Sequence, residues 1–345
     1  MKLPKTPILL TGASGFAGAH MLKYLIENSE AHVFCPVTYK HGGHKNRIRS
    51  IVPAIYSQRF TIFNCDLASD DLGKFDFMKS IETIINFASE SHVDRSISDP
   101  KHFTMNNANL MINLLEYVRS ANLKIKFIHV STDEVFGPLE KLEDNFEWQR
   151  PHFPSNPYSS SKSAQESLLI AYHKTYNLDT TIINFTNMIG EAQNQEKFIP
   201  KTIKKILENS TINIDTNTNG QIGARRYIYV GDVAKAILAI LSSQHEQCND
   251  KLLPEKFHVF GTKLVSNLEI VLAISRILNL EFKHTVLPSP RNGYDTSYQL
   301  SSNNMKNIDW VESESIFDKL AQVVKWTTEN PEWLEIDHTS LNKSY

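Results

Sequence analysis

Short apolar runs alternate with segments of helical periodicity through the first half of this chain. The apolar runs cover residues 8–10, 32–34, 60–63, 83–85 and 127–130. Between the last two, Leu110, Leu114 and Val118 recur at the three- and four-residue spacing of an amphipathic helix. This β-α alternation predicts an α/β fold in which helices cover both faces of a parallel sheet and the ligand lies beyond the carboxyl ends of the strands.

The second half of the chain is less regular. Residues 191–197 and 209–220 are rich in Gln, Asn and Thr, and they predict loops or boundaries of a lobe. A helical pattern at 232–241 returns to the first domain, and from about residue 266 there are two further helical patterns and a proline-rich strand near 288–290. We expect a nucleotide-binding domain of residues 1–185 and about 226–262. A smaller lobe of about 186–225 and 263–345 would cover the site.

The balance of charge narrows the class of partner. The chain of 345 residues has 36 Lys and Arg against 38 Asp and Glu, so no global field favours nucleic acid or an anionic membrane. Cys35, Cys65 and Cys248 show neither a CxxC pair nor zinc-ligand spacing, which indicates a reduced, cytoplasmic setting and no metal site. The apolar runs are too short to span a membrane, so we expect a soluble protein with no nucleic-acid or membrane partner.

A glycine-rich turn directly follows the first apolar run. It reads T-G-A-S-G-F-A-G at residues 11–18 and opens a helix that carries Met21, Leu22 and Leu25. Glycines permit a tight turn and close approach of the backbone to a pyrophosphate, whose charge meets the unpaired N–H groups of the helix start. An ordinary tight turn is the alternative. The predicted cofactor-binding residues of the turn are Gly12, Ser14, Gly15, Phe16, Ala17 and Gly18.

The choice between NAD and NADP is open at this stage. Where an acidic residue would hold the adenosine ribose of NAD, the chain has Cys35 and Pro36. The basic segment that follows, which includes Lys40, His44 and Arg47, either accepts the 2′-phosphate of NADP or is a solvated loop. Further on, Asp66 either accepts a hydrogen bond from adenine or only forms a turn.

Tyr158 and Lys162 lie four residues apart in a predicted helix. The helix begins with a capping Asn156 and a proline at its first turn, so both side chains share one face. A phenol has a reference pKa of about 10, and a nearby ammonium favours the phenolate, which can then take a proton from a sugar hydroxyl. The alternative is a surface pair, and the glycine-rich turn upstream favours the catalytic interpretation.

Thr132, Asp133 and Glu134 follow the fifth apolar run. Two adjacent carboxyl groups at the carboxyl end of a strand, beside a cofactor, are costly if they are only structural. Eliminating water from a 4-keto sugar needs a base for the C5 proton and an acid for the C6 hydroxyl, and two carboxyl groups in different environments suit these roles. A helix-cap and loop cluster is the alternative.

Three runs together resemble a known family. F-A-S-E-S-H-V-D-R-S-I at 87–97, S-T-D-E-V-F-G at 131–137 and P-Y-S-S-S-K at 157–162 are similar to the dTDP-glucose 4,6-dehydratases of the extended short-chain dehydrogenase/reductase, or NAD-dependent epimerase/dehydratase, family. The similarity covers nearly the whole chain. It implies a Rossmann-type doubly wound parallel sheet with a smaller C-terminal substrate-binding lobe, tightly bound NAD (with NADP as the alternative), and a homodimer paired through helices of the large domain.

The resemblance also implies a mechanism. Tyr158, aided by Lys162, would take the proton of the C4 hydroxyl while hydride leaves C4, and Thr132 would orient O4. Glu134 would then remove the C5 proton, Asp133 would protonate the departing C6 hydroxyl, and the hydride would return to C6. The substrate would be a nucleoside-diphosphate hexose of the dTDP- or UDP-glucose type.

Carried over by position, the resemblance implies two sets of binding residues. The cofactor set adds to the glycine-rich turn the residues Thr38, Lys40, Asp66, Leu67, Phe87, Ala88, Ser89, Tyr158 and Lys162. The substrate set is Ser91, His92, Asn106, Thr132, Asn187, Lys197, Phe198, Arg225, Arg291 and Tyr294.

The chain departs from the family pattern near its C-terminus. Family members often carry the basic run R-P-G-H-D-R-R-Y, whereas residues 291–298 read R-N-G-Y-D-T-S-Y, so two arginines are absent. A UDP-, GDP- or N-acetylated sugar therefore competes with dTDP-glucose as the substrate. A 4-epimerase, a decarboxylase and a non-catalytic NAD(P)-sensing protein are the competing functions, and the Asp133-Glu134 pair favours the dehydratase.

Overall fold

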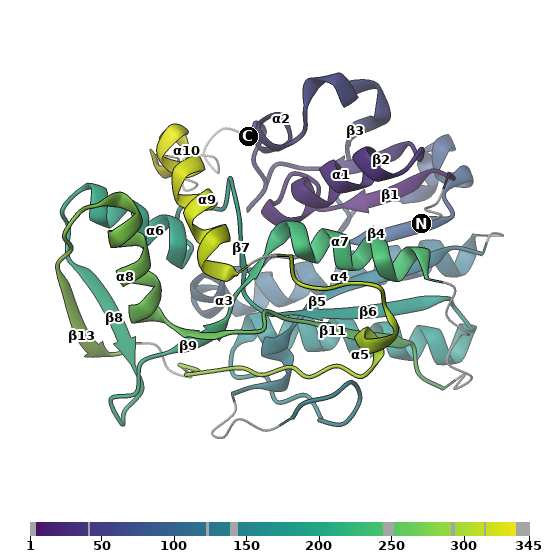
Figure 1. Cartoon of the computed structure of the whole chain (residues 1–345). Coiled ribbons are helices and arrows are strands. Elements are labelled where there is room, and N and C mark those ends of the chain that lie inside the picture. The colour runs from purple at the N-terminus through teal and green to yellow at the C-terminus, as the bar shows by residue number, and fades with distance from the viewer. Residues whose placement is uncertain are drawn as a thin grey trace.

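A seven-stranded parallel sheet forms the centre of the computed structural model, which describes residues 5–40, 42–121, 124–138, 144–243, 252–290, 294–313 and 315–335. Its strand order is β11-β6-β5-β4-β1-β2-β3 (Figure 1). The strands are β1 (Ile8–Thr11), β2 (Val33–Val37), β3 (Phe60–Asn64), β4 (Thr83–Asn86), β5 (Lys126–Thr132), β6 (Thr180–Phe185) and β11 (Glu255–Val259).

The strand order reverses direction at β1. Ile8 pairs in parallel with Val33 of β2 on one side and with Thr83 of β4 on the other, so successive strands are added first toward β3 and then toward β6. A crevice opens at such a switch point because the loops that follow the two neighbouring strands diverge. The predicted strands and the doubly wound α/β sheet are confirmed.

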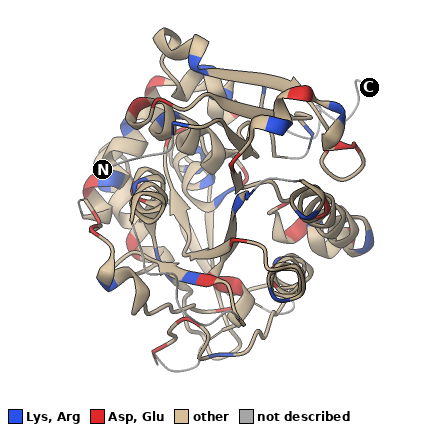
Figure 2. Cartoon of the chain, turned by 90° about the vertical axis from the view of Figure 1, so that its right-hand side faces the viewer, with Lys and Arg blue, Asp and Glu red and all other residues tan. Residues whose placement is uncertain are grey.

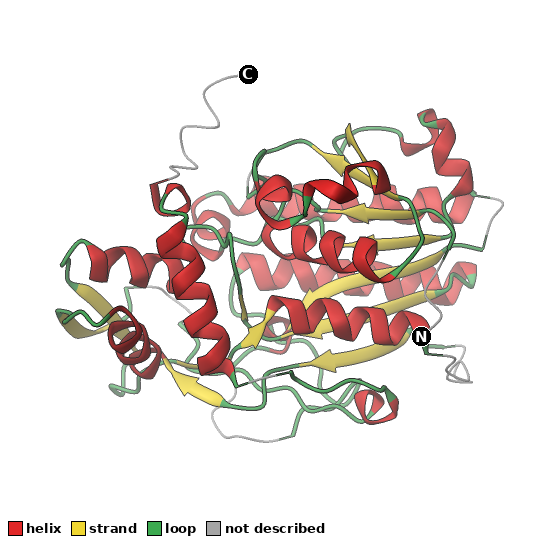
Figure 3. Cartoon of the chain, turned by 45° about the horizontal axis from the view of Figure 1, so that its top comes forward, coloured by secondary structure: helices red, strands yellow, loops and turns green. Residues whose placement is uncertain are grey.

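Helices lie on both faces of the sheet (Figure 3). Helix α1 (Phe16–Asn28) packs with α7 (Val230–Ser242) on one face, and α4 (Pro100–Ser120) packs with α5 (Pro157–Tyr176) on the other. Strand side chains alternate between the faces. Ile8 and Leu10 therefore join the core under α1 and α7, whereas Leu9 joins the core under α4 and α5.

Shorter helices connect these elements. Two of them are α-helical, α2 (Arg47–Ile51) and α3 (Val93–Ser98). The 3-10 helices are η1 (Ala54–Arg59), η2 (Leu72–Lys74), η3 (Asp76–Ser80), η4 (Asp133–Phe136) and η5 (Asn304–Asn307).

A second group of elements lies at the carboxyl end of the sheet. A separate core that includes Ile203, Ile214, Ile270 and Leu320 holds it together. Its helices are α6 (Phe198–Leu207), α8 (Asn267–Leu278), α9 (Ile316–Glu329) and α10 (Glu332–Glu335). Its strand pairs are β7 (Met188–Ile189) with β10 (Ile228–Tyr229), β9 (Ala224–Arg226) with β12 (Leu264–Ser266), and β8 (Ile212–Thr216) with β13 (His284–Pro288).

The prediction of a loop at 209–220 is wrong in part, because β8 lies inside it. Ile212 and Ile214 are buried, and β8 pairs in parallel with β13, with Ile212 opposite His284. The partner strand is some seventy residues away, so only the tertiary fold completes the pairing. The alternation of Ile212 and Ile214 with polar residues was a strand signal that the abundance of Asn and Thr obscured.

Part of the chain assigned to the lobe packs on the sheet. Met305 and Ile308 belong to the core of α1 and α7, and Trp310 Nε1 donates to the Asp232 carbonyl at 3.0 Å. The C-terminal third thus crosses between the two cores. The exact domain boundaries stay a prediction.

The positions of Lys and Arg and those of Asp and Glu are interspersed along the chain (Figure 2). Within the described ranges, the helices are either too short or too polar to cross a membrane. No group of three or more His, Cys, Asp or Glu side chains is placed to hold a metal ion among the residues that the structure describes. Cys35 and Cys65 are buried free thiols, and Cys248 lies outside the described residues.

Candidate active site

A cavity of about 940 Å³ lies where the carboxyl ends of the strands face the second group of elements. Its walls come from the loops after β1, β4, β5 and β6, from α5 and α6, and from β8 and β9. Every predicted site residue within the described ranges lines it. Arg291 lies outside the described residues.

The glycine-rich turn has the shape that a dinucleotide requires. Gly12 has a φ of +72°, and a Cβ on Gly18 would lie 2.1 Å from the Gly12 carbonyl oxygen. Gly15 caps α1 without a side-chain hydrogen bond, so the first N–H groups of the helix have no side-chain cap. These features fit a pyrophosphate at the helix start, where the positive end of the helix dipole favours an anion.

At the adenosine end of the cavity, the basic residues that the NADP hypothesis assigns to a 2′-phosphate bind protein groups instead. Lys40 Nζ forms an ion pair with Asp66 Oδ2 at 3.0 Å, and Asp66 Oδ1 accepts from the Ala68 N–H. Arg47 is fully buried and donates to backbone and amide oxygens, so it is not available to a 2′-phosphate. Thr38 and Leu67 line the same end.

Tyr158 and Lys162 are held by the first two turns of α5. Asn156 and Ser159 form a capping box with Pro157 at the first helical position, as the sequence predicts. The Tyr158 ring packs edge-to-face against Phe103 at 6.3 Å, which fixes where the phenol lies. Both side chains line the cavity, and Lys162 is buried.

The electrostatics of this pair differ from the sequence-based expectation. Burial raises the pKa of the Tyr158 phenol, the Glu134 carboxylate raises it further, and a hydrogen bond with Thr132 partly opposes them. Burial also lowers the pKa of Lys162 to about 7, and its ammonium donates to the Val130 carbonyl and to Gln165 Oε1. The protein alone therefore does not lower the pKa of the phenol. A positive charge supplied by a bound ligand is needed for that.

Asp133 and Glu134 occupy different environments in the same short helix, η4. Asp133 is 3% exposed, and burial together with the Glu134 charge raises its pKa to about 8. The pKa of Glu134 is raised by burial, while Arg225 and Lys197 lower it and the Asn156 side chain is its hydrogen-bond partner. Asp133 is therefore protonated at neutral pH, whereas cations and a hydrogen bond favour the ionised form of Glu134.

A buried network lies under the end of β5. Glu166 pairs with Lys256 at 2.8 Å, and its other oxygen is bonded by Ser131 and by Asn184. Asn184 also donates to the Thr132 carbonyl at 2.9 Å. Because both ends of the network are fixed in strands, it holds the backbone that presents Asp133 and Glu134.

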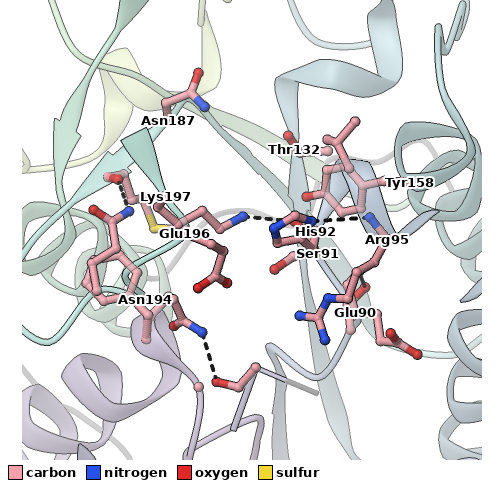
Figure 4. Close-up of a pocket in the computed structure, with 18 of the residues that line it drawn as sticks. Glu90, Ser91, His92, Arg95, Thr132, Tyr158, Asn187, Asn194, Glu196 and Lys197 are labelled. Atoms are coloured by element: carbon pink, nitrogen blue, oxygen red, sulfur yellow. Dashed lines mark hydrogen bonds between the residues drawn. The ribbon is translucent and has the colours of Figure 1, made fainter. Parts of the chain in front are cut away.

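Polar side chains from the loops after β4, β6 and β7 also line the cavity. Figure 4 shows Lys197 pointing toward Ser91 and His92, with Asn187 above Lys197. Lys197 Nζ donates to the Ser91 carbonyl at 3.0 Å and so joins the two walls. His92 Nδ1 accepts from the Arg95 N–H and caps α3, which gives it a structural role besides its place in the cavity.

The residues predicted to bind the nucleotide of the substrate lie close to the residues predicted to be catalytic. Arg225 donates to the carbonyls of Thr296 and Asp295 and lies 4.9 Å from the centre of the Tyr298 ring. Tyr294 donates to the Asp215 carbonyl at 3.0 Å. Asn106, Phe198 and the cofactor-side Phe87, Ala88 and Ser89 complete the predicted residues in the lining.

The sequence analysis missed several residues that the cavity gathers. Asn156, which was noted only as a helix cap, faces Glu134, and Asp295 accepts hydrogen bonds from Tyr298 and Ser155. The other omitted polar residues of the lining include Glu90, Asp94, Arg95, Asn194, Glu196, Lys201, Lys205, Asn213, Asp215, Tyr227 and Asn267. Their positions follow from long-range packing, and only the family-like runs at 87–97, 196–200 and 225–232 gave a local signal for some of them.

Replacing Asp133 by asparagine should make the folded protein more stable at pH 8 than the wild type. The folded state raises the pKa of Asp133 from 3.8 to about 8, so between these values it binds a proton that the unfolded chain releases. Wild-type stability therefore falls as pH rises through this window and levels off above it. Each pKa unit titrated corresponds to about 1.4 kcal/mol, and Asp133→Asn avoids the loss.

Calorimetric Tm values of both proteins at pH 5 and pH 8 test this. We expect the advantage of the variant to grow with pH, by the equivalent of about 1 kcal/mol or more. An advantage that stays constant across the window would show that Asp133 is ionised in the folded protein.

Comparison with known proteins assigns the fold and the cofactor. The model of the NAD dependent epimerase/dehydratase family matches residues 8–252. A trifunctional UDP-glucose 4,6-dehydratase/3,5-epimerase/reductase of Arabidopsis thaliana is 30% identical over 333 residues, which cover 94% of this chain and 48% of the relative. The chain thus spans about half the length of that relative. A dTDP-glucose 4,6-dehydratase of Haemophilus influenzae is 28% identical, covering 92% of this chain and 97% of the relative.

Solved structures agree with this assignment. The dTDP-glucose 4,6-dehydratase of Streptomyces venezuelae, crystallised with NAD, has a TM-score of 0.83 and 27% identity, covering 95% of this chain and 99% of that one. The UDP-glucuronic acid 4-epimerase of Bacillus cereus has a TM-score of 0.83 at 23% identity, over 94% and 99% of the two chains, which supports the fold alone. The family and its structures bind NAD, as the sequence analysis expects.

Proposed function

Because the chain belongs to the NAD dependent epimerase/dehydratase family, we propose that it is a nucleotide-sugar 4,6-dehydratase that converts a nucleoside-diphosphate hexose to its 4-keto-6-deoxy form. The observation that carries this proposal is the Asp133-Glu134 pair. Both carboxyl groups line the cavity that contains Tyr158, and their pKa values are shifted by different surroundings. An epimerase needs only the tyrosine and the lysine, whereas loss of water also needs an acid and a base.

The proposed first step is oxidation at C4. NAD, when bound, accepts the hydride from C4 and later returns it to C6. Tyr158 takes the proton of the C4 hydroxyl, and Thr132, which shares a hydrogen bond with Tyr158, orients O4. Since burial raises the pKa of the phenol, the positive charge of the oxidised nicotinamide and the Lys162 ammonium together favour the phenolate.

The proposed second step is elimination. The new C4 carbonyl acidifies C5, Glu134 takes the C5 proton, and the electron pair forms the C5–C6 double bond as the C6–O bond breaks. Asp133, which is protonated at neutral pH, gives its proton to the leaving hydroxyl so that water departs. A hydride added to C6, which bound NAD would supply in reduced form, and a proton added to C5 would complete the 4-keto-6-deoxy sugar.

Two arms test the proposal. Mass spectrometry of the copurifying dinucleotide identifies the cofactor. Incubation with dTDP-glucose, UDP-glucose, GDP-mannose and UDP-N-acetylglucosamine, followed by mass spectrometry of the products, should show loss of one water from one of them. An epimer of unchanged mass, recognised by its proton NMR spectrum, would instead identify a 4-epimerase, and NAD binding without turnover of any sugar would contradict a catalytic role.

A further inference from the structure

Arg47 is a buried cation directly behind the phosphate-binding turn. Its side chain is 0% exposed, and its guanidinium donates to the Ser14 carbonyl at 2.7 Å and to the Gly42 carbonyl at 2.8 Å. The same group donates to the Ala192 carbonyl at 3.0 Å and to Asn194 Oδ1 at 2.7 Å. One guanidinium therefore joins the cofactor turn to the segment that carries Lys197.

All of these partners are neutral oxygens. Within the described part of the chain, Arg47 forms no ion pair with a carboxylate, although the nearby Glu196 carboxylate acts on it and partly opposes the effect of burial on its pKa. The guanidinium also lies 5.2 Å from the centre of the Trp333 ring. Burial lowers its pKa to about 10, so the group stays charged at neutral pH. A buried charge without a counter-ion is costly, and structures usually supply an opposite charge nearby.

Glu196 supplies one opposite charge near Arg47 without forming an ion pair, and a ligand at the phosphate turn would bring a second. Ser14, whose carbonyl Arg47 holds, lines the cavity, whereas Arg47 itself does not. The turn and the start of α1 fit a pyrophosphate. We propose that Arg47 is a positioning residue and a buried counter-charge for the diphosphate of the dinucleotide, acting through the phosphate turn without contacting the ligand.

This inference rests on NAD binding, which is part of the proposed function, but not on dehydratase activity. A counter-charge and a purely structural brace predict different changes in the affinity for ligands when Arg47 is replaced. A brace depends on the forked geometry of the guanidinium, so it predicts that Arg47→Lys weakens NAD binding as much as Arg47→Gln does, and general disorder of the site would weaken adenosine binding as well. A counter-charge affects NAD and leaves adenosine, which is uncharged, unchanged.

The experiment measures the Kd of NAD by calorimetry, and of adenosine by ligand-observed NMR, on protein stripped of its cofactor. In Arg47→Gln, which removes the charge, the Kd of NAD should rise about tenfold or more while that of adenosine changes less than about twofold. In Arg47→Lys, which keeps the charge but loses the forked geometry, NAD should bind within about threefold of the wild type. Arg49→Gln, on the exposed side of α2, is the matched control and should change neither Kd.

Equal weakening of NAD and adenosine in Arg47→Gln would overturn the proposal, as would unchanged NAD binding. Should Arg47→Gln fail to fold, Arg47→Lys still decides: retained NAD binding supports the counter-charge, and a selective loss of NAD binding refutes it. Neither readout depends on turnover, so the dehydratase assignment stands or falls separately.

Discussion

Tyr158→Phe should lower kcat by about 10³-fold and prevent the first oxidation. The phenol is the group in the cavity that shares a hydrogen bond with Thr132 and lies one helical turn before Lys162. Phenylalanine fills the same space and keeps the packing on Phe103, but it has no oxygen to receive the C4 hydroxyl proton. Stopped-flow absorbance should show no reduced nicotinamide after mixing the variant with substrate.

Tyr172→Phe is the matched control, because it removes a phenol from the same helix outside the cavity. Tyr172 donates to Glu116 at 2.6 Å and is expected to leave kcat unchanged when replaced. Normal turnover in Tyr158→Phe, with NAD bound as in the wild type, would remove the tyrosine from the mechanism.

Glu134→Gln should abolish exchange of the C5 hydrogen with solvent and lower kcat by about 10²- to 10³-fold. The amide is nearly isosteric, so the hydrogen bond of Asn156 with this position is the least disturbed, but it cannot take a proton. The first oxidation does not use Glu134, so reduced nicotinamide should accumulate after mixing. Incubation in deuterated water, with mass spectrometry of the recovered sugar, measures the exchange.

Asp133→Asn provides the contrast. It keeps the C5 base and removes the acid, so C5 should still exchange while water is not expelled. Wild-type rates of C5 exchange in Glu134→Gln would assign the base to another residue. If both variants lost exchange equally, the two carboxyl groups would not have the separate roles that their surroundings suggest.

The architecture was readable from the sequence because its signals are local. Alternating apolar runs and helical patterns predicted the parallel sheet. The turn at residues 11–18 predicted the phosphate site, because its glycines are required by a backbone conformation that only a few neighbouring residues define. Asn156 and Pro157 likewise predicted where α5 begins. The strand β8 was missed because its partner β13 lies far along the chain.

Charge states were not readable in the same way. The sequence suggested that Lys162 lowers the pKa of Tyr158, whereas the fold buries both groups, raising the pKa of the phenol and lowering that of the ammonium. It also grouped Arg47 with exposed basic residues, but the fold buries its guanidinium behind the phosphate turn. Desolvation depends on every neighbour, and those neighbours come from distant segments.

The sequence by itself determined which residue types are present and at what spacing: the glycine turn, the Tyr158-Lys162 pair and the adjacent Asp133 and Glu134, together with the α/β order that brings strand ends to one edge. Only the tertiary structure decided that Asp133 is desolvated enough to hold its proton near pH 7, and that Asn156 and Arg225 face Glu134. The physical reason is that the backbone hydrogen bonds of helices and turns involve residues only a few positions apart in the sequence. The burial and the electrostatic energy of a side chain depend instead on the residues that pack around it in space.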